Sequence, residues 1–380
     1  ENRAQTEAYL GDLWDAFADQ VAISRNHPRA DLDQIAAETM ILRGHEAAAA
    51  GLIDASSTES EMLARLSLAT GREALATPRL LSLRQYGQTR PAGTHTRDRI
   101  AVIVAEGVMQ GGESHLDVAG AETLVSELRR ARTNDRIKAV VLRINSPGGD
   151  ALAAELIAEE ILATQAVKPV VASMGDYAAS GGYYIAAPCQ EIFANPSTLT
   201  GSIGVFGVLW DAEQALDEQL GLGYDRVETH PHATIGNPGF SMRPAEEAFF
   251  QQNVAHTYGL FLRRVQEGRG MADSIAVDSL AQGRVWSGRA ANTIGLVDTF
   301  GGLQDAIDRA AELAGLGESI RIELRPQLKT PLVEMLEEMT GARSLSPALA
   351  GAVERVEELR RFVPGSGVYA LDLSALGEIE

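Results

Sequence analysis

Short apolar runs alternate with amphipathic stretches along the middle of the chain. Continuous runs of mostly apolar, β-prone residues occupy 100–105, 137–145, 170–174 and 192–194. Longer stretches between them, such as 121–131, space their apolar residues three and four apart, as a helix does. Strands that are apolar on both faces and separated by helices are typical of a buried, parallel sheet. The pattern therefore predicts an α/β fold in this part of the chain.

Both ends of the chain have a different pattern. Near the N-terminus Leu10, Trp14, Phe17 and Val21 follow helical spacing, which predicts a mostly helical segment. A polar stretch with Pro and Gly then predicts a linker, and the charged C-terminal end predicts a helical arm. The expected parts are helical residues 1–85, the linker 86–97, an α/β domain at 98–316 and the C-terminal helical arm 317–380.

The N-terminal segment repeats part of the α/β domain. A gap-free shift of 244 residues aligns identical or similar residues over about 38 positions. The pairs are Phe17 and Phe261, Val21 and Val265, Arg25 and Arg269, Gly44 and Gly288, Ala47 and Ala291, Gly51 and Gly295, Leu52 and Leu296, and Asp54 and Asp298. Amphipathic helices followed by glycine resemble one another by chance, but one register over this length favours a duplication. We expect residues 1–75 to be the second half of a domain whose complete copy occupies 98–316, the first half of the earlier copy preceding Glu1.

Composition narrows the function classes. With 45% apolar and 22% charged residues, the 380-residue chain has the composition of a globular protein with a substantial core. Its net charge of −19 disfavours a surface that binds nucleic-acid phosphates. A single cysteine forms neither an internal disulfide nor a thiolate zinc cage. No apolar run reaches the roughly 18–20 residues of a membrane helix, and the first residues do not resemble a signal peptide. These features predict a soluble globular piece without a metal site.

Two loops follow neighbouring predicted strands and carry residues suited to chemistry. The sequence Asn-Ser-Pro-Gly-Gly at 145–149 precedes a helix capped by Asp150, and its glycines leave backbone N–H groups unshielded. Ser180 stands among alanines and glycines, where a turn at 175–179 leads into a helix at 181–187. The first loop also fits an ordinary turn between strand and helix, and Ser180 is a candidate helix cap as well as a candidate nucleophile. Because parallel strands end at the same edge of a sheet, we expect the two loops to converge.

A serine nucleophile needs a base within hydrogen-bond reach. His230 and His232 lie in a loop after Ser180, yet loop histidines are more often exposed than catalytic. A buried, neutral lysine is the other common base. Lys138 and Lys168 precede the strands that lead to the two loops, so they belong to the opposite edge of the sheet, and the third lysine is in the tail region. The chain therefore contains no evident base for Ser180.

Three segments together resemble a known family. INSPGGD, SMGDYAASGGYYIAAP and ANPSTLTGSIGVFGV are similar to the signal peptide peptidase A (protease IV) family of serine proteases, in its long, duplicated form. The resemblance covers essentially the whole chain and is strong from Asp98 to Leu316. It implies a ClpP/crotonase-like fold, a Ser/Lys dyad, signal peptides and other apolar peptides as substrates, and no cofactor. It further implies an N-terminal membrane anchor in the bacterial inner membrane, a catalytic part that faces the periplasm, and a homotetramer.

The resemblance also assigns roles to individual residues. Ser180 matches the nucleophile, and Ser202 matches the serine that orients the lysine amine. Backbone N–H groups of Gly148 or Gly149, together with that of Gly181, match the oxyanion hole.

The lysine is where this chain departs from the family. In the shorter members it lies in a loop that corresponds to HPHATI, near Ala233, where this sequence has none. In the long form it comes from the equivalent loop of the first domain, which the 244-residue shift places about a dozen residues before Glu1. We therefore expect the 380-residue chain to be inactive by itself. Two other functions stay open: a crotonase-like acyl-CoA enzyme and a non-catalytic scaffold subunit.

Overall fold

The computed structural model describes residues 2–73, 97–317 and 320–326, together with residue 78 and the short stretches 80–83 and 85–86. Most of the predicted linker, Lys329 and the remainder of the predicted C-terminal arm lie outside these residues.

A largely parallel sheet forms the centre of the α/β domain. All neighbours along its main path are parallel. In spatial order the strands are β10 (Arg321–Arg325), β1 (Arg99–Glu106), β4 (Ile137–Ser146), β5 (Val170–Ala179), β6 (Glu191–Ala194) and β9 (Thr299–Phe300). Strand β4 is buried at seven of its ten positions, so it is apolar on both faces, as the sequence pattern predicts.

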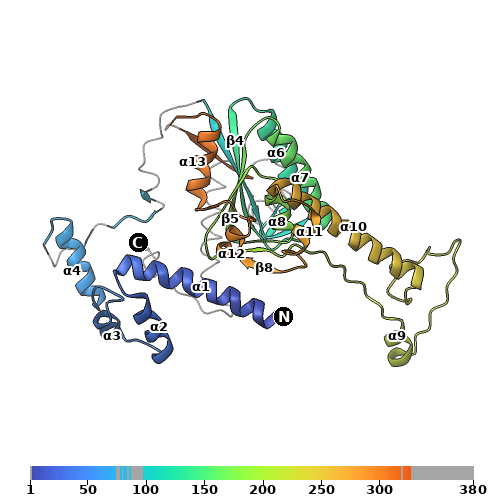
Figure 1. Ribbon diagram of the computed structural model, residues 1–380, viewed down its shortest axis with the longest axis horizontal. Coiled ribbons are helices and arrows are strands. Elements are labelled where there is room, and N and C mark those ends of the chain that lie inside the picture. Colours follow the sequence, from blue (N-terminus) through green and yellow to red (C-terminus); the bar gives the residue numbers. More distant parts are fainter. Residues whose placement is uncertain are drawn as a thin grey trace, which may run out of the picture. The chain divides into compact units, whose positions relative to one another are not determined.

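Helices cover both faces of this sheet (Figure 1). On one face lie α6 (Ala121–Thr133), α7 (Ala151–Gln165) and α8 (Gly181–Ala186), and α10 (Pro244–Arg269) adds Phe261 and Val265 to the same core. On the other face α13 (Leu303–Leu313) buries Ala306, Ile307, Ala310 and Ala311 against β1, β4 and β5. This three-layer arrangement confirms the predicted α/β class.

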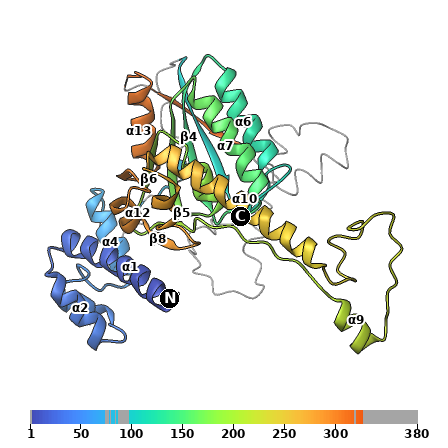
Figure 2. The ribbon, with the colours of Figure 1, turned by 45° about the vertical axis from the view of Figure 1, so that its right-hand side comes forward.

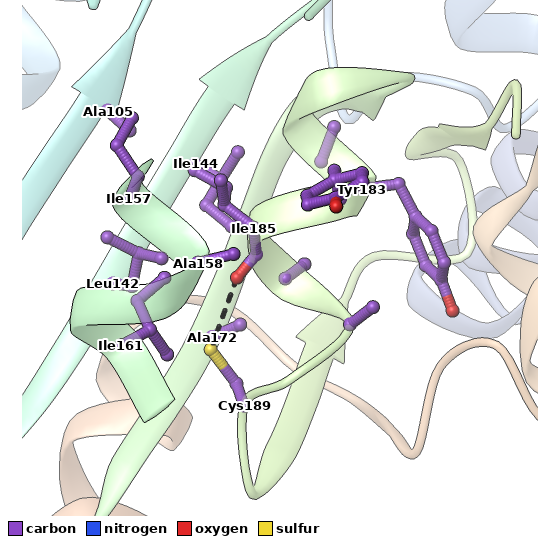
Figure 3. Packing of buried hydrophobic residues seen from close by; sticks show 14 of the residues in the cluster. Ala105, Leu142, Ile144, Ile157, Ala158, Ile161, Ala172, Tyr183, Ile185 and Cys189 are labelled. Carbon is purple, nitrogen blue, oxygen red and sulfur yellow. Dashed lines mark hydrogen bonds between the residues drawn. The ribbon is translucent and has the colours of Figure 1, made fainter. Parts of the chain in front are cut away.

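The short helix α8 is embedded in the larger core, as Figure 3 shows for Tyr183 and Ile185 beside Ile144 and Ala172. All six residues of α8 are buried. The Tyr183 hydroxyl donates a hydrogen bond to the Leu296 carbonyl oxygen at 2.8 Å. Burial raises the pKa of the Cys189 thiol to about 12, so this cysteine is a packing residue and not a nucleophile. The helix that follows Ser180 is therefore held rigidly.

The turn predicted at 175–179 is wrong, because β5 continues as a strand as far as Ala179. The register between β4 and β5 shifts between Ile144 and Ser146, which marks a bulge. At the bulge the Asn145 side-chain oxygen accepts hydrogen bonds from the N–H groups of Asp176 and Tyr177, at 3.1 and 3.4 Å. The Asn145 side-chain oxygen thus pairs with two backbone N–H groups that the bulge leaves without a strand partner, so β5 continues beyond the bulge.

Several strands have no counterpart in the sequence prediction. Strand β7 (Leu199–Gly201) pairs with the end of β5 and, antiparallel, with β8 (Val285–Ser287). Strands β2 (Val108–Gln110) and β3 (Val118–Gly120) form a separate two-stranded sheet. Residues 321–325 were expected to belong to a helical arm but form β10, which pairs with β1. These strands have three to five residues, too short to produce a recognisable period.

The repeated segment has the same succession of helices in both copies. Under the 244-residue shift, α3 (Gly44–Ala49) matches α12 (Gly288–Thr293), and α4 (Glu59–Ala69) matches α13. Under the same shift, the last residue of the first helix α1 (Asn2–Arg25) aligns with the last residue of α10. The helix α2 (Arg29–Glu38) aligns with a range that includes α11 (Ser274–Asp278). Figure 2 shows α1, α2 and α4 in blue and α10, α12 and α13 in yellow to orange.

Ion pairs and glycine conformations repeat as well. Arg25 pairs with Asp54, and in the second copy Arg269 pairs with Asp298. Gly51 and its counterpart Gly295 have φ angles of 74° and 79°. The predicted repeat is therefore a structural repeat of one helical unit.

Candidate active site

Ser180 lies where β5 ends and α8 begins, in a backbone conformation with φ 50° and ψ −117°. This region is rare for a residue with a side chain and costs roughly 1–3 kcal/mol. The backbone is pinned on both sides: its N–H donates to the Gly201 carbonyl at 2.9 Å, and its carbonyl accepts from the Tyr184 N–H at 2.8 Å. The side chain makes no capping hydrogen bond to α8. Ser180 therefore occupies the cap position without acting as a side-chain cap, and its hydroxyl is available for chemistry.

The Pro-Gly-Gly turn packs directly against Ser180. Gly148 and Gly149 have φ angles of 96° and 154°, which disfavour a side chain at either position. A Cβ atom on Gly148 would lie 2.5 Å from the Gly181 nitrogen and 2.9 Å from the Ser180 Cβ. A Cβ atom on Gly181 would lie 3.3 Å from the Gly149 nitrogen. The two loops that the sequence places after neighbouring strands do converge, as predicted.

The N–H groups at this junction are not equivalent. The Gly148 N–H donates to the Ser146 hydroxyl at 3.1 Å. No hydrogen bond from the Gly149 or Gly181 N–H to another residue is present in the part of the chain that the structure describes. Two unpaired donors beside a serine hydroxyl are what an oxyanion requires. Of the two turn glycines that are candidates by sequence, the geometry favours Gly149 over Gly148.

A cavity of about 1440 Å³ opens at this junction. Pro147, Gly148, Gly149 and Ser180 lie on its wall together with Ser202. The remaining lining residues are Gly204, Val205, Phe206, Gly207, Val208, Leu209, Met242, Glu247, Phe250, Gln251, Val254, Ala255, Tyr258, Gln282 and Gly283. Among the described residues the wall is mainly apolar, with Glu247 as its one charged side chain. A cavity of this size and lining suits an extended, apolar ligand.

Ser202 approaches the same cavity from β7. It directly follows Gly201, which pairs with Ala179 immediately before Ser180. The Ser202 backbone has φ 47°, and its N–H donates to the Arg284 carbonyl at 2.8 Å. Neighbouring strand ends thus bring the two serines to one cavity wall.

Histidines do not complete the site. None of the histidines that the structure describes lines the cavity. His232 Nδ1 lies 2.9 Å from a Glu246 carboxylate oxygen, and the His230 and His256 side chains are exposed. The expectation that the loop histidines are ordinary surface residues is consistent with these positions.

The two lysines within the described residues belong to the other edge of the sheet, as predicted. Lys138 is at the start of β4, with its Nζ 3.7 Å from an Asp98 carboxylate oxygen. Lys168 precedes β5, and its Nζ donates to the Ala131 and Asn134 carbonyls at 2.6 and 2.7 Å. Burial lowers the pKa of Lys168, but its hydrogen bonds show that it caps the C-terminal end of α6. Neither lysine can reach Ser180 from there.

Sequence reasoning missed the cavity wall formed by residues 204–209 and the first half of α10. The available signal was the apolar run after Ser202, GVFGVLW, which belongs to no predicted strand. In the structure Phe206 and Trp210 are 86% and 81% exposed, although apolar surface is normally buried in a folded chain.

The described residues contain neither a metal-binding cluster nor a membrane-spanning helix. They include no cluster of His, Cys, Asp and Glu suited to a metal ion. Likewise, none of the helices among them has the length and apolar character needed to span a membrane.

Together these features define a class of protein: a parallel α/β fold in which a strained serine at a strand–helix junction faces a cavity beside two unpaired backbone amides. A family model described as peptidase family S49 matches residues 1–72 and 162–317, more than half of the chain. The chain therefore belongs to peptidase family S49, whose fold is ClpP/crotonase-like. Because residues 1–72 shift onto 245–316, the matched segments include both copies of the repeat.

Relatives of known name agree with this family. The chain is 40% identical to Protease 4 of Salmonella typhi over 271 residues, 71% of this chain and 43% of that protein. It is 33% identical to Protease 4 of Haemophilus influenzae over 334 residues, 85% of this chain and 54% of that protein. It is 36% identical to the chloroplastic serine protease SPPA of Arabidopsis thaliana over 256 residues, 66% of this chain and 37% of that protein. The chain thus spans about half, or less, of the length of these relatives.

Proposed function

We propose that the chain is the nucleophile-bearing part of a serine endopeptidase with a Ser/Lys dyad. The observation that carries this proposal is the Ser180 hydroxyl, which makes no capping bond and lies beside the unpaired N–H groups of Gly149 and Gly181. Membership of peptidase family S49 supports the same chemistry.

In the proposed reaction Ser180 Oγ gives its proton to a neutral lysine amine and attacks the carbonyl carbon of a peptide bond. The negative charge that develops on the carbonyl oxygen is stabilised by the Gly149 and Gly181 N–H groups. The C–N bond then breaks, and the lysine ammonium protonates the departing amine. Water, deprotonated by the same lysine, attacks the acyl-enzyme carbonyl carbon; the ester C–O bond breaks, and the lysine ammonium returns the proton to Ser180 Oγ. Ser202, on the same wall, is suited to accept a hydrogen bond that orients the lysine.

The lysine is proposed to come from a segment upstream of Glu1, in a longer form that we call the full-length protein. The described lysines are at the wrong edge of the sheet. Named relatives are about twice as long as the matched region, so they have room for a complete first copy of the repeated domain. A lysine brought by that copy would enter the cavity from outside the chain's own α/β domain.

An uncovered apolar surface on the first copy supports the same conclusion. In the second copy Phe261 and Ala306 are 2% and 0% exposed, because α10 and α13 pack on the sheet. Their counterparts Phe17 and Met62 are 62% and 48% exposed. Because the two copies correspond residue by residue, these side chains are suited to pack on a second parallel sheet, equivalent to the sheet within residues 98–243. We propose that the missing half-domain is the occupant of this surface.

Substituting the paired phenylalanines tests this occupancy. In the 380-residue chain we expect Phe17→Ala to change the free energy of unfolding by about 0.5 kcal/mol or less, because the side chain is exposed. Phe261→Ala should cost about 3–5 kcal/mol. In the full-length protein both should be destabilising in chemical denaturation. A Phe17→Ala variant with full stability there would show that the surface is not covered.

The proposed substrates are apolar peptides, signal peptides among them. The apolar wall of the cavity suits an extended hydrophobic segment, and the small residues around Ser180 let a peptide backbone approach closely. Following the family resemblance, we propose that the full-length protein is anchored in the bacterial inner membrane, faces the periplasm and assembles as a homotetramer.

Activity measured with and without the upstream segment tests the dyad. We expect the full-length protein to cleave a fluorogenic apolar peptide and the purified 380-residue chain to leave it intact, because the described residues include no lysine near Ser180. Robust cleavage by the 380-residue chain would contradict an upstream lysine.

The acyl-CoA alternative receives no support from the site. Among the described residues that line the cavity there is no lysine or arginine, so none of them is suited to the phosphates of CoA. A thermal shift on adding CoA would favour that alternative, and an unreactive Ser180 in the full-length protein would favour a scaffold.

A further inference from the structure

Ser146 is a buried polar residue that the proposed reaction does not use. It is the last residue of β4, immediately before the Pro-Gly-Gly turn, and its exposed fraction is 0%. Its hydroxyl donates a hydrogen bond to the Gly107 carbonyl at 2.6 Å and accepts one from the Gly148 N–H at 3.1 Å. The hydroxyl therefore connects the end of β1 to the first glycine of the turn.

A second contact fixes the next peptide unit of the turn. The Gly148 carbonyl accepts a hydrogen bond from the Met109 N–H at 2.8 Å, and the Asp150 N–H donates to the Met109 carbonyl at 2.9 Å. In a planar trans peptide the C=O and the N–H point in opposite directions. Because the Gly148 carbonyl points to Met109, the N–H of Gly149 must point away from it. Gly181 lies close to this nitrogen, since a Cβ atom on Gly181 would be 3.3 Å from it.

We propose that Ser146 is the positioning residue that decides which amide of the turn faces the oxyanion. By holding the Gly148 N–H inward, its hydroxyl prevents that amide from competing for the cavity and leaves the Gly149 N–H as the donor. This inference rests on the proposed function, since it concerns the same oxyanion site.

Removing the hydroxyl should release the turn. Without it the Gly148 N–H and the Gly107 carbonyl would both be buried without a partner. The peptide unit between Gly148 and Gly149 would then be held by the Met109 contact alone, and because both residues are glycines it could leave that contact and rotate with little steric resistance. Rotation would turn the Gly148 carbonyl toward Ser180, where it would repel the negative charge of the tetrahedral intermediate.

The test is Ser146→Ala in the full-length protein, with cleavage of a fluorogenic apolar peptide as the assay. We expect kcat to fall roughly 10- to 100-fold, because one oxyanion donor is misplaced. KM should stay within about twofold, because the substrate contacts of the cavity wall are unchanged. Affinity for a peptide aldehyde, which forms an anionic adduct with Ser180, should fall in parallel with kcat. Ser146→Cys retains a weak donor and acceptor and should recover part of kcat.

Ser173→Ala is the matched control. Ser173 is also 0% exposed, lies on the neighbouring strand β5 and accepts a hydrogen bond from Arg143 at 2.9 Å, away from the turn. It should lower thermal stability without changing kcat or aldehyde affinity. Equal kcat losses in the Ser146 and Ser173 variants would overturn the positioning role. Cleavage that survives Ser180→Ala would instead overturn the proposed function, so the two failures are distinguishable.

Discussion

Ser180→Ala in the full-length protein is expected to lower kcat for peptide cleavage by about 10⁴-fold or more, since loss of the nucleophile leaves only binding and oxyanion stabilisation. The fold should be unaffected, because the Ser180 side chain makes no capping hydrogen bond and alanine keeps the same backbone constraints. The measurement is steady-state hydrolysis of a fluorogenic apolar peptide, with unfolding followed by circular dichroism.

Ser197→Ala is a suitable control, because this serine is exposed in the loop before β7. It should retain wild-type kcat. Ser180→Gly provides a second inactive variant, and the positive φ of 50° predicts that it is about 1 kcal/mol more stable than Ser180→Ala. Unchanged turnover in either Ser180 variant would refute the nucleophile assignment.

Gly149→Ala is expected to have the next largest effect. A Cβ atom at this position would lie 2.1 Å from the Met109 carbonyl oxygen, and the φ of 154° is unfavourable for alanine. The turn must move, which should cost about 2–4 kcal/mol of the free energy of unfolding. Because the same movement displaces the Gly149 N–H from the oxyanion, we expect kcat to fall by about 10² to 10³-fold. Denaturant titration and steady-state kinetics measure the two effects.

Gly112→Ala is the control for Gly149→Ala, because it introduces backbone strain without steric crowding. Gly112 also has a positive φ, of 85°, but no atom lies within 4 Å of its Cβ position. It should cost about 1 kcal/mol and leave kcat unchanged. Wild-type kcat in a folded Gly149→Ala variant would rule out the Gly149 N–H as an oxyanion donor.

The sequence predicted the parts of the fold that depend on local patterns. The runs that form β1, β4, β5 and β6 are continuous and apolar, so the sequence alone predicts that these strands are buried on both faces. The motif at 145–149 and Ser180 were placed after neighbouring strands, and the structure brings them together.

The sequence did not predict the elements whose hydrogen-bond partners lie far away along the chain. Strand β7 exists because it pairs with the end of β5 on one side and with β8, more than 80 residues later, on the other. The extension of β5 through its bulge depends on the Asn145 side chain, and β10 depends on the edge of β1. In each case hydrogen bonds over long sequence separation override weak local propensity.

By itself, the sequence determined the α/β class, the 244-residue repeat and the candidacy of Ser180 and the Pro-Gly-Gly turn, because these follow from residue identity and spacing; Ser202 and Gly181 became candidates through the family resemblance. Only the tertiary structure decided that the Ser180 hydroxyl is not a cap and that Gly149 and not Gly148 has the unpaired amide. The physical reason is that a peptide N–H has no sequence signature. Its availability depends on which acceptor the folded chain brings to it, and Ser146 and Met109 make that choice across separate strands.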